Sequence, residues 1–313
     1  MNTMKNKNIV ITGGLGFIGS HIVDELIDNN NITIIDDEST GKLENLKNPN
    51  HANLTLEKGN LNNLDLDKIL KDTDYVFHLA AMASVPLSID KPLESTKNNL
   101  NATIKLAIAS KNQNIEKIIF SSSSAVYGEN LNMPLKETEP LMPSSPYAAS
   151  KASSELYLQT FTKSYGLNST SLRYFNVFGP KQDINSQYAA VIPNFIFTLL
   201  NNKQPIIYGD GEQTRDFIFV EDIVKANIAA AKSNYNGVLN IASGKKITIN
   251  QLLDIIQNIL GTDIKPKYLE KRKGDIKHSL ADVSNMGKIN YKVDSSLFKK
   301  QIETTVEWFK NTN

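Results

Sequence analysis

The sequence of 313 residues contains no cysteine, which excludes disulfides, thiolate metal sites and thiol nucleophiles. Such a composition is typical of a reducing compartment. Histidine is also scarce, and no two of the four residues lie at metal-ligand spacing: His21, His51, His78 and His278. We therefore expect no dedicated metal site.

Basic runs and long apolar runs are missing as well. The net charge is only +1, so we expect no phosphate-neutralising surface for nucleic acid. No apolar run reaches the roughly 18 residues that are typical of a membrane span. The N-terminus enters a strand without the segments of a signal peptide. These features predict a cytoplasmic protein that binds neither nucleic acid nor membranes.

The first half of the sequence alternates short apolar strands with amphipathic helices. Strands are predicted at residues 8–12, 32–36, 54–58, 75–79, 117–121 and 169–175. Helices are predicted at residues 17–28, 97–111 and 147–164. This order predicts an α/β protein with a Rossmann-type doubly wound parallel sheet, covered by helices on both faces.

The pattern becomes less regular after Gly179 and Pro180. Further elements are predicted at residues 193–200, 206–208, 217–220, 222–231, 248–260 and 296–309, the last with the only tryptophan, Trp308. A chain of this length suits one large domain and one smaller one. We interpret residues 1–179 as a Rossmann domain and residues 180–313 as a smaller C-terminal α/β domain. The smaller domain mainly binds substrate, and some strands are interleaved between the two.

A glycine-rich loop links the first predicted strand to the first predicted helix. Gly13 permits a tight turn, Gly16 permits a pyrophosphate to approach the backbone, and Gly19 permits close packing of helix and strand. The following helix N-terminus then faces the phosphate charge. The context of strand and helix favours a dinucleotide site over a plain glycine turn.

An acidic pair follows the second predicted strand. Asp36 lies where an acidic residue accepts hydrogen bonds from the ribose hydroxyls of a dinucleotide, and it would repel the 2′-phosphate of NADP. Asp37 strengthens that repulsion, and no basic residue follows before Lys42. The cofactor predicted from these residues is NAD.

Tyr147 and Lys151 lie four residues apart in a predicted helix and therefore share one face. A lysine cation, together with a positive nicotinamide ring, would stabilise the phenolate and lower the pKa of Tyr147. A phenolate near neutral pH is a usable general base. Taken alone, the pair would indicate an ordinary surface helix. The serine-rich run at residues 121–128, which follows a predicted strand, favours an active site.

Seven strings together resemble the extended short-chain dehydrogenases and, more narrowly, the nucleotide-sugar 4-epimerases of the UDP-glucose/UDP-galactose type. They are TGGLGFIGSH, FHLAAMASVPLSIDKP, SSSSAVYG, SPYAASK, LRYFNVFGP, YGDGEQTRDFIFVED and KRKGDI. The resemblance covers nearly the whole chain. It implies that Tyr147 is the base, that Lys151 tunes it and binds the nicotinamide ribose, and that Ser123 hydrogen-bonds the sugar 4-hydroxyl.

The resemblance also implies two sets of binding residues. The NAD positions are Gly13, Gly16, Phe17, Ile18, Gly19, Asp36, Asp37, Ser39, Thr40, Gly41, Asn60, Leu61, Leu79, Ala80, Ala81, Ala83, Asn98, Ser121, Tyr147, Lys151, Tyr174 and Phe175. The UDP-sugar positions are Ser84, Val85, Ser123, Tyr147, Asn176, Ala190, Val191, Ile206, Tyr208, Arg215, Arg272, Asp275 and Ser279. Among them, Asn176 and the two arginines would hold the UDP, since a guanidinium binds pyrophosphate oxygens in pairs.

The activity implied by the resemblance is transient oxidation of the sugar at C4, followed by return of the hydride to the opposite face. Related dehydratases and decarboxylases need an extra acid or base near Ser124 and Ala125, and neither residue can serve. Alternatives are a UDP-glucuronate 4-epimerase, for which we identify no cation aimed at the sugar carboxylate, and a non-catalytic NAD-binding relative.

Three positions depart from the family pattern. Ala83 replaces a lysine that is frequent there, and Asn60 replaces an aspartate near the adenine, from which we expect a weakened cofactor contact. Ser279 replaces a tyrosine that narrows the sugar pocket in some members. A small residue there leads us to hypothesise that UDP-GlcNAc and UDP-GalNAc are substrates as well as, or instead of, UDP-glucose and UDP-galactose.

The resemblance further implies a homodimer formed through a four-helix bundle. The corresponding helices are those predicted at residues 97–111 and 147–164. Ala102, Leu106 and Ala109 form a possible packing stripe for a partner, and ordinary burial against the sheet is the alternative.

Overall fold

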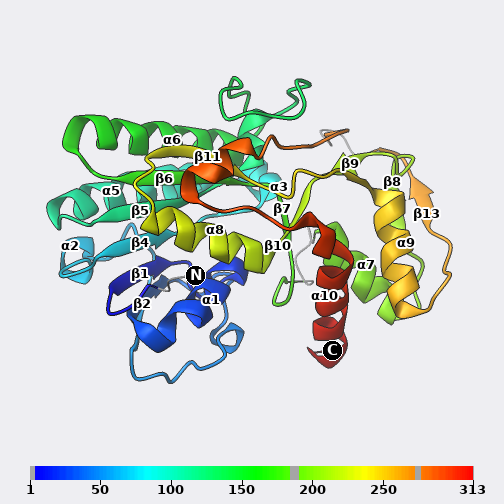
Figure 1. Cartoon of the computed structure of the whole chain (residues 1–313), viewed down its shortest axis with the longest axis horizontal. Helices are drawn as coiled ribbons and strands as arrows, with labels where there is room; N and C mark the ends of the chain where they lie inside the picture. The colour runs from blue at the N-terminus through cyan, green and yellow to red at the C-terminus, as the bar shows by residue number, and fades with distance from the viewer. Residues whose placement is uncertain (1–3, 184–189, 272–275, 313) are drawn as a thin grey trace.

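The computed structural model describes residues 4–183, 190–271 and 276–312. Its centre is a seven-stranded parallel sheet in the order β11-β6-β5-β4-β1-β2-β3 (Figure 1). The strands are β1 (Asn8–Thr12), β2 (Asn31–Asp36), β3 (Leu54–Lys58), β4 (Tyr75–His78), β5 (Lys117–Ser123), β6 (Ser169–Tyr174) and β11 (Gly237–Ile241). The predicted doubly wound α/β fold is confirmed.

Alternation along the strands explains why both faces of the sheet are covered. Successive residues of β1 point to opposite faces: Ile9 and Ile11 join one apolar cluster, and Val10 joins the other. The first cluster lies under helices α1 (Phe17–Leu26) and α8 (Val220–Lys232). The second lies under α2 (Leu66–Ile69), α5 (Ala102–Asn112) and α6 (Pro146–Tyr165). Each helix therefore buries one apolar stripe against the sheet.

Helix α6 has clear signals at both ends. The hydroxyl of Ser145 accepts a hydrogen bond from the backbone N–H of Ala148 at 3.2 Å, and Pro146 occupies the first turn. Gly166 ends the helix with a φ of 72°, which only glycine adopts without strain. These caps fix a helix of 20 residues that carries both Tyr147 and Lys151.

Residues 97–111 are helical as predicted, but their first part is not α-helical. A π-helical turn, η3 (Lys97–Asn101), follows the short helices α3 (Val85–Asp90) and α4 (Pro92–Thr96), and only then does α5 begin. The side chain of Asn99 explains this turn, because it bonds to the backbone of Met82 and to the hydroxyl of Ser150 instead of facing solvent. Such turns are frequent at functional sites.

The packing stripe considered for a partner is also corrected. Ala102, Leu106 and Ala109 are at most 3% exposed and pack inside the second apolar cluster, so ordinary burial is the correct interpretation for them. Smaller differences occur at helix ends. Helix α1 ends at Leu26 and is followed by the 3-10 turn η1 (Ile27–Asn29), and α10 (Phe298–Thr312) begins after η6 (Ser295–Leu297).

The second half of the chain forms its own apolar cluster. Helices α7 (Val191–Leu200), α9 (Ile249–Leu260) and α10 pack together there, beside the paired short strands (Figure 1). The pairs are β7 (Asn176–Phe178) with β10 (Phe217–Phe219), β9 (Thr214–Arg215) with β12 (Ile247–Thr248), and β8 (Ile206–Tyr208) with β13 (Lys267–Leu269). Strand β11 returns from this half to the main sheet. None of the described helices is long and apolar enough to cross a bilayer.

Candidate active site

The glycine-rich loop lies where the order of strands reverses, between β1 and its neighbours β2 and β4. Gly13 has a φ of 70°, and a Cβ there would stand 2.8 Å from the backbone nitrogen of Ala80. A Cβ on Gly19 would stand 2.1 Å from the carbonyl oxygen of Gly13. A side chain at Gly13 would therefore clash with the backbone that follows β4, and a side chain at Gly19 would clash with the glycine-rich loop. The tight turn at Gly13 and the close packing at Gly19 agree with the sequence analysis.

Asp36 faces back toward the glycine loop. Its Oδ2 accepts a hydrogen bond from the backbone N–H of Leu15 at 3.0 Å, and its Oδ1 accepts one from Glu38 at 2.9 Å. Burial raises the pKa of this carboxyl, and the two backbone donors oppose that rise. The pKa of Asp37 is lowered, because hydrogen bonds from Ser39 and Asn60 outweigh the effect of burial. Two carboxyls thus border the place where the sequence predicts the adenosine ribose.

The side chain of Asn60 is hydrogen-bonded within the protein. Its Oδ1 already accepts two hydrogen bonds from Asn62, and its Nδ2 donates to Asp37 at 3.1 Å and to Asn98 at 3.2 Å. The amide therefore presents a donor to Asp37, and its oxygen is used within the loop. Lys105 supports the same loop, because its ammonium donates to three backbone carbonyls, those of Leu61, Asn62 and Leu64.

The remaining predicted cofactor positions lie on loops around this edge. Leu79 and Ala80 donate their backbone N–H groups to the hydroxyl of Thr12. The half-buried or exposed positions are Phe17, Ile18, Ser39, Thr40, Ala81, Ala83 and Asn98. The buried ones are Gly41, Leu61, Ser121, Tyr174 and Phe175. The buried hydroxyl of Tyr174 donates a hydrogen bond to the side chain of Asn227 at 2.9 Å, so it is bound within the protein interior.

Ser123, Tyr147 and Lys151 meet where β5 ends and α6 begins. Ser123 is the last residue of β5 and contacts the half-buried phenol of Tyr147. The ammonium of Lys151 lies 6.0 Å from the centre of the Tyr147 ring and donates to the carbonyl of Ser121 at 2.7 Å. The structure therefore brings together the three residues that the sequence singles out as catalytic.

The charge states at this site differ from the expectation. Burial raises the pKa of Tyr147, and the hydrogen bond with Ser123 offsets part of that rise. Burial also lowers the pKa of Lys151 to about 7, although the charge of Glu155 opposes the fall. Desolvation disfavours both charged forms, so the protein alone does not give Tyr147 the lowered pKa that we expected.

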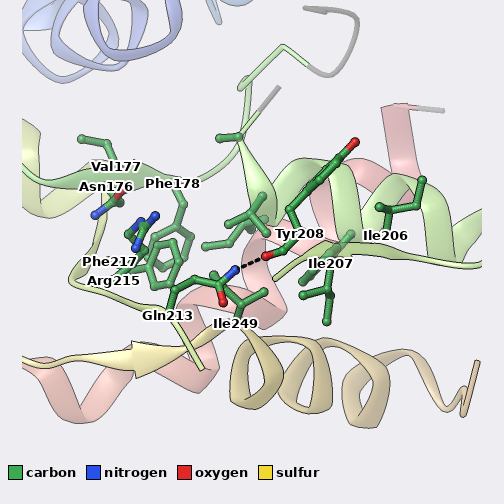
Figure 2. Close-up of a pocket in the computed structure, with 14 residues that line it drawn as sticks. Asn176, Val177, Phe178, Ile206, Ile207, Tyr208, Gln213, Arg215, Phe217 and Ile249 are labelled. Carbon is green, nitrogen blue, oxygen red and sulfur yellow. Dashed lines mark hydrogen bonds between the residues drawn. The ribbon is translucent and has the colours of Figure 1, made fainter. Parts of the chain in front are cut away.

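A cavity of about 410 Å³ lies in the second half of the chain (Figure 2). Six predicted UDP-sugar positions line it: Asn176, Ala190, Val191, Ile206, Tyr208 and Arg215. The sequence analysis missed an apolar part of the wall, namely Val177, Phe178, Ile192, Phe195, Ile207, Phe217 and Ile249, and it also missed Gln213. Gln213 donates to the carbonyl of Tyr208 at 2.8 Å. The consecutive apolar residues of β10 and the largely apolar sequence of α7 were the available signal.

Ser84, Val85 and Ser279, which were also predicted to bind substrate, are not among the residues that line this cavity. Ser84 caps α3 and Val85 begins it, and α3 is tied to the catalytic helix because Tyr147 donates its backbone N–H to Ser88 at 3.1 Å. Ser279 is 9% exposed and donates its backbone N–H to Thr214 at 3.1 Å. Arg272 and Asp275 fall outside the described residues.

Asp216 is a further residue that the sequence analysis missed. It is fully buried next to Arg215 and accepts hydrogen bonds from the backbone of Ser243, Gly244 and Ala281, and from the Ser243 hydroxyl. Burial raises its pKa to about 6, despite these donors. The carboxyl thereby fixes the strand that presents Arg215 to the cavity.

These features define a class of protein. A sequence model described as the NAD dependent epimerase/dehydratase family matches residues 9–242. The chain belongs to this family, which confirms the resemblance to extended short-chain dehydrogenases. A putative UDP-glucose 4-epimerase of Methanocaldococcus jannaschii is 38% identical and aligns over 97% of this chain and 99% of its own length.

Two solved structures are similar throughout. A UDP-N-acetylglucosamine 4-epimerase from Methanobrevibacter ruminantium M1, in complex with UDP-N-acetylmuramic acid, is 64% identical. Its TM-score is 0.98, with 99% of this chain and 100% of that chain covered. A UDP-glucose 4-epimerase from Thermotoga maritima with UDP-glucose is 39% identical, with a TM-score of 0.92 and coverage of 97% and 99%.

NAD is the cofactor of this family. The described residues fit it, because Gly13 and Gly19 allow a tight loop that no larger residue could form and two carboxyls border the predicted ribose position. The N-terminus of α1, a helix of ten residues, begins at Phe17 directly after the loop.

We predict that the protein binds NAD more tightly than NADP by about 100-fold or more, because a 2′-phosphate would meet Asp36 and an ionised Asp37. The Asp37→Asn variant should narrow this ratio about tenfold. Calorimetric titration with each dinucleotide measures it, and Asp263→Asn, at an exposed site, is the control. Equal affinities of the unmodified protein for both dinucleotides would contradict the assignment.

Proposed function

We propose that the chain catalyses the NAD-dependent 4-epimerisation of a UDP-hexose. The observation that carries the proposal is the combination of two sites in one molecule: the Ser123, Tyr147 and Lys151 centre, and the cavity lined by Arg215 and Tyr208. We also propose that residues 1–179 hold NAD and that residues 180–313 mainly hold the UDP-sugar.

The cavity suits a nucleotide. In Figure 2, Arg215 and Asn176 lie at one end and Tyr208 at the other, with Phe178 and Phe217 between. A guanidinium binds pyrophosphate oxygens, and aromatic and apolar walls pack against a base. Binding energy from the UDP, remote from the reacting carbon, holds the substrate while its sugar turns.

Tyr147 is the base of the proposed reaction. It takes the proton from the sugar 4-hydroxyl, holds it while the C4 carbonyl exists, and returns it when C4 is reduced from the other face. Ser123 hydrogen-bonds the same oxygen. The cationic form of Lys151, with its ammonium 6.0 Å from the centre of the Tyr147 ring, would favour the phenolate by its charge. Bound NAD supplies the acceptor and donor of the hydride.

Dehydration is disfavoured at this site. The strand end continues into the 3-10 turn η4 (Ser124–Tyr127), in which Ser124 and Ala125 offer no carboxyl group. Loss of water from the sugar requires a further acid or base. Reversal of configuration at C4 needs only the groups already present.

We predict that Tyr147→Phe lowers kcat for epimerisation by about 10² to 10⁴, the usual contribution of a general base. NAD and UDP affinities should stay the same, because neither depends on the lost proton. NMR of a panel of UDP-sugars measures turnover. Tyr165→Phe, at the exposed end of the same helix, is the control. Unchanged turnover by Tyr147→Phe would refute the mechanism, and turnover confined to UDP-glucuronate would favour that epimerase instead.

We further propose that acetylated UDP-hexoses are substrates. Ser279 is small, and the 64% identical neighbour is a UDP-N-acetylglucosamine 4-epimerase. We predict that Ser279→Tyr slows turnover of UDP-GlcNAc about tenfold or more while UDP-glucose turnover changes little, since the larger ring takes the volume of the acetyl group. Ser279→Ala should keep both activities. Absence of any turnover of acetylated sugars by the unmodified enzyme would exclude the proposal.

A homodimer is the proposed assembly. Helices α5 and α6 leave large apolar side chains exposed, namely Ile108 at 46%, Leu156 at 54% and Tyr157 at 45%. We predict a particle of two 34.8 kDa chains in light scattering, and a shift toward single chains in Leu156→Glu, because the charge would be buried at the interface. Leu131→Glu, at an exposed site outside these helices, is the control. A single-chain mass for the unmodified protein would reject the dimer.

A further inference from the structure

A buried ion pair lies one helical turn beyond Lys151. Arg173, on β6, donates its Nη2 to Oε2 of Glu155 at 2.6 Å and its Nε to Oε1 at 2.9 Å. The two residues are 3% and 0% exposed. Removing one member of such a pair is costly, whereas replacing both by apolar groups is often neutral. Burial alone therefore does not explain the presence of the pair.

The Glu155 carboxylate also binds β5, the strand that ends at Ser123. Ser122 donates its hydroxyl to Oε1 of Glu155 at 2.5 Å. Its neighbour Ser121 supplies the carbonyl that accepts from Lys151, and its other neighbour is Ser123. Glu155 thus connects α6 to the end of β5 at Ser122, which lies between Ser121 and Ser123.

The titratable and aromatic groups around Lys151 come from three elements. On α6 they are Glu155, whose charge raises the pKa of Lys151, and Tyr147, at 6.0 Å. On β4, His78 is neutral near pH 7, because burial and the charge of Lys151 lower its pKa to about 3. On β5, the ring of Phe120 lies 4.8 Å from the ammonium. Arg173 is bound to Glu155. Glu155 is the carboxylate in this set.

We propose that Glu155, held by Arg173 and Ser122, is a positioning residue of the reaction. It keeps Lys151 cationic near neutral pH and fixes the strand end that presents the Ser121 carbonyl and Ser123. This inference rests on the proposed function, in which the cation of Lys151 stabilises the Tyr147 phenolate.

Three variants separate this role from a structural one. Glu155→Gln removes the charge but leaves Arg173 unpaired. The double variant Glu155→Gln/Arg173→Met removes both charges and should recover most of the thermal stability lost in the single variant. Glu155→Asp keeps a negative charge near Lys151.

The decisive readout is the pKa of Lys151, followed by NMR of 13C-labelled lysine side chains between pH 5.5 and 9. Its signal is assigned by its absence from the Lys151→Arg variant. We expect the pKa to fall by about one unit in Glu155→Gln and in the double variant, since a nearby opposite charge shifts a pKa by about one to three units. Glu155→Asp should stay closer to the unmodified protein.

Epimerisation should follow the same order. A lower pKa means that the lysine cation is lost at a lower pH, so the alkaline limb of the kcat profile should move down by the same amount. A folded double variant with an unchanged Lys151 pKa would overturn the inference. If the unmodified protein turns over no UDP-sugar, the proposed function fails, and the NMR titration still decides the role of Glu155.

Discussion

Seven parallel strands in one sheet end at one edge, and that constraint gathers the site. Parallel strands are joined by helices that return the chain to the opposite edge, so each strand delivers its last residues to the same side. The glycine loop, Asp36, the backbone after His78, and Ser123 all lie at such ends. Residues more than 100 positions apart in the sequence therefore meet without any covalent link between them. Helix α6 then brings Tyr147 and Lys151 to the same edge.

The fold could be predicted well because its signals are local. Short apolar strands, amphipathic helical periodicity and the glycine-rich loop predicted most elements of the first half, and β1, β3 and β8 agree with the predicted bounds. The π-helical turn at Lys97–Asn101 could not be predicted in this way. It depends on bonds from Asn99 to Met82 and Ser150, which are distant in sequence and meet only in the folded chain.

The residues of the candidate site could be predicted from the sequence, but their hydrogen-bond partners and pKa shifts could not. Spacing and residue type drew attention to Tyr147 and Lys151, and the resemblance to the family added Arg215. They did not reveal that the Asn60 oxygen is already occupied or that Asp216 anchors the strand beside Arg215. Nor did they show that burial raises the pKa of Tyr147. The Asn60 oxygen is occupied by a loop partner two residues away, whereas the other two features depend on burial and on partners from other elements.

Two regions divide the work in the proposed reaction. The cavity of the second half binds the UDP, which takes no part in bond breaking, and the edge of the sheet holds the groups that act at C4. Burial works against the charged forms of both Tyr147 and Lys151. The buried carboxylate of Glu155 opposes that effect on Lys151, so in this proposal a residue remote from the substrate helps to keep the lysine beside the base cationic.

The central claim is that C4 is oxidised by loss of a hydride and is then reduced by the return of that same hydride. The most direct test is epimerisation of a UDP-hexose that carries deuterium at C4, with the product followed by NMR and mass spectrometry. The account predicts that the product keeps the deuterium at C4, because it leaves and returns within one turnover. Loss of the label to solvent during epimerisation would contradict it.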